Sequence, residues 1–159
     1  MSPSLPQIMG RDLLGAKKEL PGDLPATRTY VIAAFLRDQQ GAVDRWISAL
    51  ADRGVADSPL DPAFTGENIV LEFPVLGSKW FLFQRRFDAT MAAYIKNPRV
   101  LARTWTFYTN VDHFCRSTRI ETTSQVSAMA LDKSGNVLSL VTGEVDASKI
   151  AQLMDISHE

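Results

Sequence analysis

Sulfur and imidazole groups, which carry much of the chemistry of small proteins, are scarce in this sequence. The 159 residues contain one cysteine, Cys115, and two histidines, His113 and His158. Dithiol exchange requires two sulfur atoms and a structural zinc site requires four ligands, so the chain has the residues for neither. No nucleophile elbow, phosphate-binding glycine loop or His-Glu-x-x-His helix is present in the sequence. We therefore expect no catalytic residue, no metal and no cofactor.

The lone thiol has two interpretations. Cys115 lies beside Phe114 in a short helix expected from about Asp112 to Arg119, which favours a small buried core residue. The alternative is a single peroxidatic or redox-sensing thiol.

A polar stretch that separates two apolar segments is the strongest candidate for a binding site. It follows the apolar run Tyr30–Leu36 and precedes Ala42–Ala51, whose apolar residues recur at helical spacing. Free N–H groups at a helix start favour anions, and an arginine there can bind a carboxylate or phosphate. In the alternative interpretation Asp38 or Gln39 caps the helix and the arginine is solvated. The candidate residues are Arg37, Asp38, Gln39, Gln40 and Asp44, while the neighbouring Trp46 is expected in the core.

A second candidate is a surface for an acidic partner or a second copy of the chain. The apolar residues from Trp80 to Ile95 have helical spacing, and four consecutive large ones, Trp80–Phe83, surround one turn. The candidate residues of this surface are Trp80, Arg85, Arg86 and Arg103, with Arg99 nearby. The alternatives are a solvated basic face and a helix buried from two sides.

Composition excludes several function classes. Seventeen basic residues nearly balance eighteen acidic ones, so there is no electrostatic case for binding nucleic acid. The longest apolar run, Tyr30–Leu36, is far shorter than the roughly 20 residues of a membrane helix. The first residues lack the basic and apolar regions of a signal peptide. We expect one domain, residues 1–159, without membrane insertion and in the cytoplasm.

Hydrophobic patterning predicts an alternation of strands and helices. Expected strands are 29–36, 69–76, 103–109, 126–131 and 137–141, and a hairpin-like lead-in spans 5–20. Pro74 suggests an edge position or the end of its strand. Expected helices are 42–51, 80–95 (ending near Asn97-Pro98), 112–119 with Asn110 or Asp112 as cap, and 146–154 with Asp146 as cap. Alternating strands and helices predict an α/β fold, in which helices cover both faces of the sheet.

Nearly the whole chain resembles the thioredoxin-like superfamily, in its peroxiredoxin and membrane-anchored thioredoxin branch. The resemblance depends on Gly10, Gly15 and Leu20-Pro21 in the lead-in, on the Phe35 strand that runs into a helix, and on the ending Ala130–Val137 with Gly143. It implies a central mixed sheet with helices on both faces and an N-terminal hairpin. A narrower resemblance, in Phe87–Met91 and Arg103–Asn110, is to the mitochondrial ATP-synthase assembly factors.

The resemblance also indicates where redox members have their reactive groups. Their Cys-x-x-Cys lies at the helix start, which here corresponds to Gln40 and Val43, and their cis-proline corresponds to Val126. Val126 therefore joins the candidate site, and disulfide oxidoreductase activity is not expected. The favoured function is a non-redox binding or assembly module whose partner is a protein, with a homodimer as one form. The alternatives are a small-molecule-binding enzyme that takes an anionic ligand at residues 37–40, and a single-cysteine peroxidase.

Overall fold

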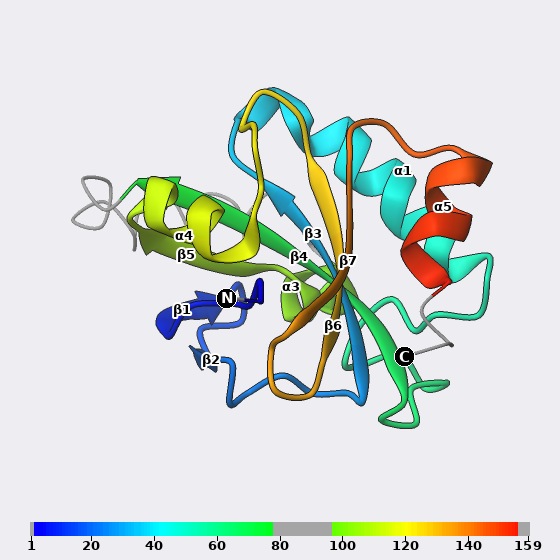
Figure 1. Cartoon of the computed structure of the whole chain (residues 1–159). Coiled ribbons are helices and arrows are strands. Elements are labelled where there is room, and N and C mark those ends of the chain that lie inside the picture. The colour runs from blue at the N-terminus through cyan, green and yellow to red at the C-terminus, as the bar shows by residue number, and fades with distance from the viewer. Residues whose placement is uncertain (1, 78–96, 156–159) are drawn as a thin grey trace.

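The computed structural model describes residues 2–77 and 97–155 and contains the alternation of strands and helices that the sequence predicts (Figure 1). The strands are β1 (Ile8–Asp12), β2 (Lys17–Leu20), β3 (Arg28–Ala34), β4 (Asn68–Gly77), β5 (Trp105–Thr109), β6 (Ser127–Asp132) and β7 (Val137–Thr142). The helices are α1 (Gln40–Ala51), α3 (Pro98–Arg103), α4 (Val111–Thr118) and α5 (Ala147–Met154), and a 3-10 turn, η1 (Arg37–Gln39), precedes α1.

The strands form one mixed sheet in the order β2-β1-β5-β4-β3-β6-β7. The central strands β3, β4 and β5 are parallel to one another, whereas β6 is antiparallel to β3, β7 is antiparallel to β6, and β1 is antiparallel to both β2 and β5. This arrangement confirms the α/β class, the mixed sheet and the N-terminal hairpin.

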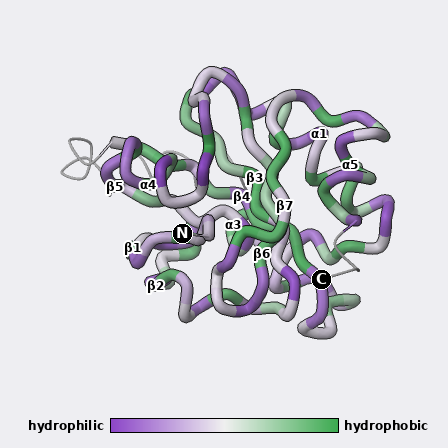
Figure 2. The backbone as a smooth tube through the Cα atoms, in the orientation of Figure 1, coloured by the Kyte–Doolittle hydropathy of each residue, from purple (hydrophilic) through white to green (hydrophobic). Residues whose placement is uncertain are grey.

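Helices cover both faces of the sheet, and each face has its own apolar core. On one face α1 and α5 pack against β3, β4 and β6; this core contains Tyr30, Ile32, Trp46, Leu50, Val70, Ala128, Ile150 and Leu153. On the other face α4 contributes Phe114 to a core with Val31, Leu71, Phe73, Trp105, Phe107 and Met129. Figure 2 shows the consequence: the central strands are hydrophobic along much of their length, whereas hydrophilic segments recur on the helices.

The N-terminal hairpin is held against β5 by a close backbone approach. A Cβ atom at Gly10 would lie 2.2 Å from the carbonyl oxygen of Thr106, so only glycine fits at this position of β1. At the turn the Asp12 carboxylate accepts hydrogen bonds from the backbone N–H groups of Leu14 and Ala16, both at 2.9 Å. Gly15 has a φ of 95°, a conformation that glycine adopts without strain.

Asparagine and aspartate side chains cap the helices, and they decide between the predicted alternatives. Asn110 caps α4 by accepting a 2.9 Å hydrogen bond from the His113 N–H, so Asn110 and not Asp112 is the cap. Asp146 caps α5 as predicted, through the Lys149 N–H at 2.7 Å.

The prediction for Pro74 is wrong. Pro74 does not lie at an edge, because β4 is between β3 and β5; it pairs with Ala34, the last residue of β3, and β4 continues to Gly77 beside β5. The short helix α3 was not predicted: it begins at Pro98, and Asn97 caps it by accepting a hydrogen bond from the Arg99 N–H. The expected helix 80–95 lies outside the described residues. Within the described ranges, no helix combines the length and apolar character needed to cross a membrane.

Candidate functional site

The predicted corner lies where β3 leads through η1 into α1, and its outer surface includes Leu36, Arg37 and Asp38 together with Gln40. The side chains of residues 36–38 are exposed, and Leu36 has 52% of its surface in contact with solvent. Within the described part of the chain, the side chains of Arg37 and Asp38 have no hydrogen bond or ion pair. The corner therefore presents an apolar side chain followed by one positive and one negative charge.

Gln39 belongs to the interior of the corner. Its side-chain oxygen accepts hydrogen bonds from the N–H groups of Phe35 at 2.8 Å and Leu36 at 3.2 Å, and its amide nitrogen donates to the Thr123 carbonyl at 2.8 Å. Its side chain is buried, and it does not accept from the N–H groups at the start of α1. The predicted alternative of an Asp38 or Gln39 side-chain cap is therefore wrong. Gln39 instead connects the end of β3 to the loop that precedes β6.

Gln40 is the first residue of α1, and its side chain turns toward the sheet. Its amide nitrogen lies 3.0 Å from an oxygen of Asp44 and 3.0 Å from Oε1 of Glu72 in β4. Glu72 was not among the predicted site residues, although a glutamate within the apolar run 69–75 was a visible signal. Only 2% of Glu72 is exposed, and burial raises the pKa of its carboxyl group, while Gln40 and Arg103 act in the opposite direction. Its second oxygen, Oε2, has no hydrogen-bond partner.

The remaining predicted positions are part of the α1-side core. Val43 is fully buried, Val126 is 2% exposed, and Trp46 is fully buried as predicted. The indole N–H of Trp46 donates a 2.8 Å hydrogen bond to the Gly143 carbonyl, which connects α1 to the end of β7. The structure therefore gathers Gln39, Gln40, Asp44, Val43 and Val126 around one corner but leaves only part of it open to a partner.

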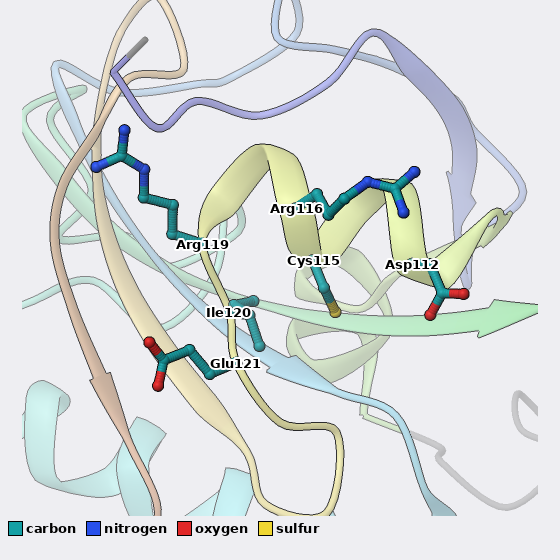
Figure 3. Close-up of a pocket in the computed structure, with 6 residues that line it drawn as sticks. All are labelled: Asp112, Cys115, Arg116, Arg119, Ile120 and Glu121. Carbon is teal, nitrogen blue, oxygen red and sulfur yellow. The ribbon is translucent and has the colours of Figure 1, made fainter.

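Cys115 is half-buried and packs against the α4-side core, which agrees in part with the expectation of a small buried core residue. It lines a pocket of about 440 Å³ together with Asp112, Arg116, Arg119, Ile120 and Glu121. Burial raises the pKa of the Cys115 thiol, and the carboxylate of Asp112 raises it further. Figure 3 shows the guanidinium groups of Arg116 and Arg119 pointing away from the sulfur. The surroundings therefore favour the thiol over the nucleophilic thiolate.

The predicted partner surface is described only at its end. Trp80, Arg85 and Arg86 lie outside the described residues. Arg103 is half-buried and donates a 3.3 Å hydrogen bond to the Asp57 carbonyl, and Arg99 pairs with the carboxylates of Asp57 and Asp61 at 2.6 and 3.2 Å. Through this hydrogen bond and these ion pairs, the two arginines connect α3 to the loop that follows α1. In the described ranges, no group of three or more His, Cys, Asp or Glu side chains is placed to hold a metal ion.

No family model and no curated protein matches the sequence, but solved structures match its fold. The exposed lipoprotein thioredoxin of Streptococcus pneumoniae superposes with a TM-score of 0.57 at 10% identity, over 92% of this chain and 96% of that one. A Sco-family cytochrome c oxidase assembly protein gives 0.59 at 9% identity, over 99% and 94%. A secreted thiol-disulfide isomerase from Corynebacterium glutamicum gives 0.57 at 17% identity, over 98% and 86%. The chain has a thioredoxin-like fold.

At such low identities the thioredoxin-like fold carries no information about activity, so the chemistry depends on this chain's own residues. Dithiol exchange needs two sulfur atoms, and the sequence contains one cysteine; the first turn of α1 contains Gln40 and Val43. The first is hydrogen-bonded to Glu72 and the second is buried in the core. Neither side chain can replace a thiol.

Proposed function

We propose that this chain is a thioredoxin-like binding module, an assembly or accessory factor that acts through protein contacts and not through dithiol exchange. The observation that carries the proposal is the division of the corner into two parts. Gln39 is buried and Gln40, although exposed, donates to the buried Glu72, whereas the exposed side chains of Leu36, Arg37 and Asp38 have no such internal bond. An exposed leucine followed by two charged residues, on a corner whose backbone is held by Gln39, has the character of a small protein-recognition surface.

Two further observations support this function. The internal hydrogen bonds of Gln39 fix the backbone of residues 35–36, so binding a partner costs little conformational entropy at the corner. In addition, one protein with the same fold is named as a member of a family of cytochrome c oxidase assembly proteins. A role in assembly is therefore compatible with this architecture, and a cytoplasmic location remains part of the proposal.

The experiment is site-specific photo-cross-linking with the full chain in its source cells. A benzoylphenylalanine at position 37 should yield a discrete protein adduct, and the same group at Arg53, which is exposed just beyond the other end of α1, should not. Leu36→Asp should remove the adduct without unfolding the chain, because the leucine packs little against the core.

The proposal also requires that the purified protein does not catalyse insulin reduction by dithiothreitol. Absence of an adduct at position 37, or an adduct that persists in Leu36→Asp, would contradict the binding surface. Catalysed disulfide reduction, or peroxide consumption that Cys115→Ser abolishes, would replace the binding function with an enzymatic one.

A further inference from the structure

Glu72 is a titratable group buried directly beneath the start of α1. Side chains alternate between the two faces of a strand, and Val70 of β4 belongs to the α1-side core, so Glu72 points to the same face. With 2% of its surface exposed and Oε2 unpartnered, it is a buried polar group whose hydrogen-bonding capacity is only half used. Such a group is stable in its neutral form and costly in its charged form.

One amide nitrogen connects this buried carboxyl group to the surface. Gln40 Nε2 has two hydrogen atoms and lies 3.0 Å from both Glu72 Oε1 and Asp44 Oδ1. Asp44 is exposed one turn into α1, so the amide lies between a buried carboxyl group and a solvated one. The first turn of α1 therefore covers Glu72, and Gln40 is the residue of that turn that donates a hydrogen bond to it.

The other groups that face Glu72 offer little to a buried carboxylate. The described residues that act on Glu72 are Gln40 and Asp44 of α1, Arg103 of α3 and Thr104. Asp44 repels a charge on Glu72, whereas the Arg103 guanidinium attracts it and the Thr104 side chain also favours it. However, Arg103 donates to the Asp57 carbonyl and its Nε has no partner, so it does not complete the hydrogen bonding of Oε2.

We propose that the proton on Glu72 is a conformational switch for the corner: the closed first turn of α1 accommodates the protonated carboxyl group beneath it, and loss of that proton to solvent loosens the turn. The hydrogen bond from Gln40 favours the carboxylate but reaches only Oε1, so a carboxylate at this position still needs water or a second donor at Oε2. Opening the first turn of α1 admits water to Oε2 and exposes Val43 of the α1-side core. If residues 36–38 bind a protein, as in the proposed function, that binding weakens as the pH rises.

Hydrogen exchange of the free protein tests the switch without any partner. Exchange of the amides of residues 37–44 is measured from pH 5 to pH 8 and corrected for intrinsic rates, with strand β6 as the reference for global unfolding. The opening constant of the first turn should rise by about tenfold per pH unit above about 4.5 and level off once Glu72 titrates in the closed state. Throughout, this turn should open more readily than β6. In Glu72→Gln, which keeps the shape of the side chain without its charge, the opening constant should not change with pH.

Three results would overturn the switch: opening of the first turn that is independent of pH in the natural sequence, the same slope in Glu72→Gln, or equal protection of the first turn and β6. A measurement on the unmodified chain makes the test independent of the variant. In carbon-detected NMR the pKa of the Glu72 carboxyl should lie above 4.5, and the backbone amides of Gln40 and Gly41 should shift with the same midpoint. Amides that do not follow the carboxyl would exclude the coupling. None of these outcomes depends on whether residues 36–38 bind a protein.

Discussion

Glu72 determines how the stability of the whole chain should vary with pH. Burial raises its folded-state pKa above the ordinary 4.5, so the folded chain binds this proton more tightly than the unfolded chain does. The free energy of unfolding is therefore highest below about pH 4.5 as far as this group is concerned, and it declines as the pH rises to the folded-state pKa. The decline is about 1.4 kcal/mol for each unit by which the pKa is raised.

We expect Glu72→Gln to remove this decline and to make the protein more stable than the natural sequence at pH 8. The measurement is urea unfolding at pH 5, 6, 7 and 8. Asp44→Asn is the matched control, because it removes a carboxylate from the same cluster at an exposed position. A natural protein whose stability does not decline relative to Glu72→Gln between pH 5 and pH 8 would show that Glu72 titrates normally.

Gln39 should contribute more to stability than any other residue of η1. Truncation to Ala leaves the N–H groups of Phe35 and Leu36 and the Thr123 carbonyl without their hydrogen-bond partner. Leaving a buried donor or acceptor unsatisfied costs about 1–3 kcal/mol. Thermal or urea unfolding of Gln39→Ala should show a loss of that size. Asp38→Ala, next to it and exposed, should change the stability by less than about 0.5 kcal/mol. Equal effects of the two substitutions would contradict the assigned hydrogen bonds.

The Cys115 thiol should react slowly with alkylating reagents. Its pKa is raised by burial and by Asp112, so at neutral pH its thiolate fraction lies below that of a free cysteine. Asp112→Asn should lower the pKa and accelerate reaction with iodoacetamide, measured by mass spectrometry at pH 7.5. Glu121→Gln is the control, since Glu121 also lines the pocket but is not among the groups that shift this pKa. A larger acceleration in Glu121→Gln would refute this electrostatic assignment.

At the residue scale, the sequence predicted where the corner would be but not how its side chains would be used. The exposure of Arg37 and Asp38 followed from their polarity next to a buried strand. The roles of Gln39 and Gln40 depend on Thr123 and Glu72, which lie 84 and 32 positions away along the chain. The local sequence pattern contains no information about such long-range contacts. It therefore could not distinguish an amide that is hydrogen-bonded inside the protein from one that is available to bind a ligand.

At the element scale, hydrophobic periodicity was sufficient for most of the described strands and helices, but it missed α3. Asn97-Pro98 was interpreted only as the end of the expected helix 80–95, yet asparagine before proline is also a typical helix start, with the amide oxygen as cap and proline in the first turn. Pro74 indicated an edge because proline cannot donate to a ladder. The structure accommodates it where pairing with β3 ends and pairing with β5 takes over.

The attachment of the N-terminal hairpin to β5 should depend on the absence of a side chain at Gly10. In Gly10→Ala the new methyl group would lie 2.2 Å from the Thr106 carbonyl oxygen and 2.6 Å from the Phe107 ring, so β1 has to move away from β5. We expect a loss of stability of about 1–3 kcal/mol in urea unfolding. Gly22→Ala is the control, because no atom lies within 4 Å of its added Cβ. Equal stability of the two variants would place β1 farther from β5 than the structure does.

At the scale of the whole molecule, the two apolar cores share the same central strands. Successive residues of β3 face opposite cores, with Ile32 on the α1 side and Val31 on the α4 side, and β4 and β6 alternate in the same way. Loss of one core would leave these strands with one bare face and weaken their ladders. The apolar run Tyr30–Leu36 is typical of a strand that is buried on both faces. It could not predict which helices cover which face, because this depends on the path of the connections.

Because of this sharing, the two cores should unfold together. Trp46 lies fully buried in the α1-side core and Trp105 lies buried in the other, so each reports on one face of the sheet. In protein labelled with 5-fluorotryptophan, the native fluorine resonances of Trp46 and Trp105 should lose intensity at the same urea concentration, as two-state unfolding requires. The shared midpoint should not change with reductant, since Cys115 has no second cysteine in the chain with which to form a disulfide. Separate midpoints would mean that one layer of helices can detach while the sheet persists, and the corner at the start of α1 would then belong to the less stable unit.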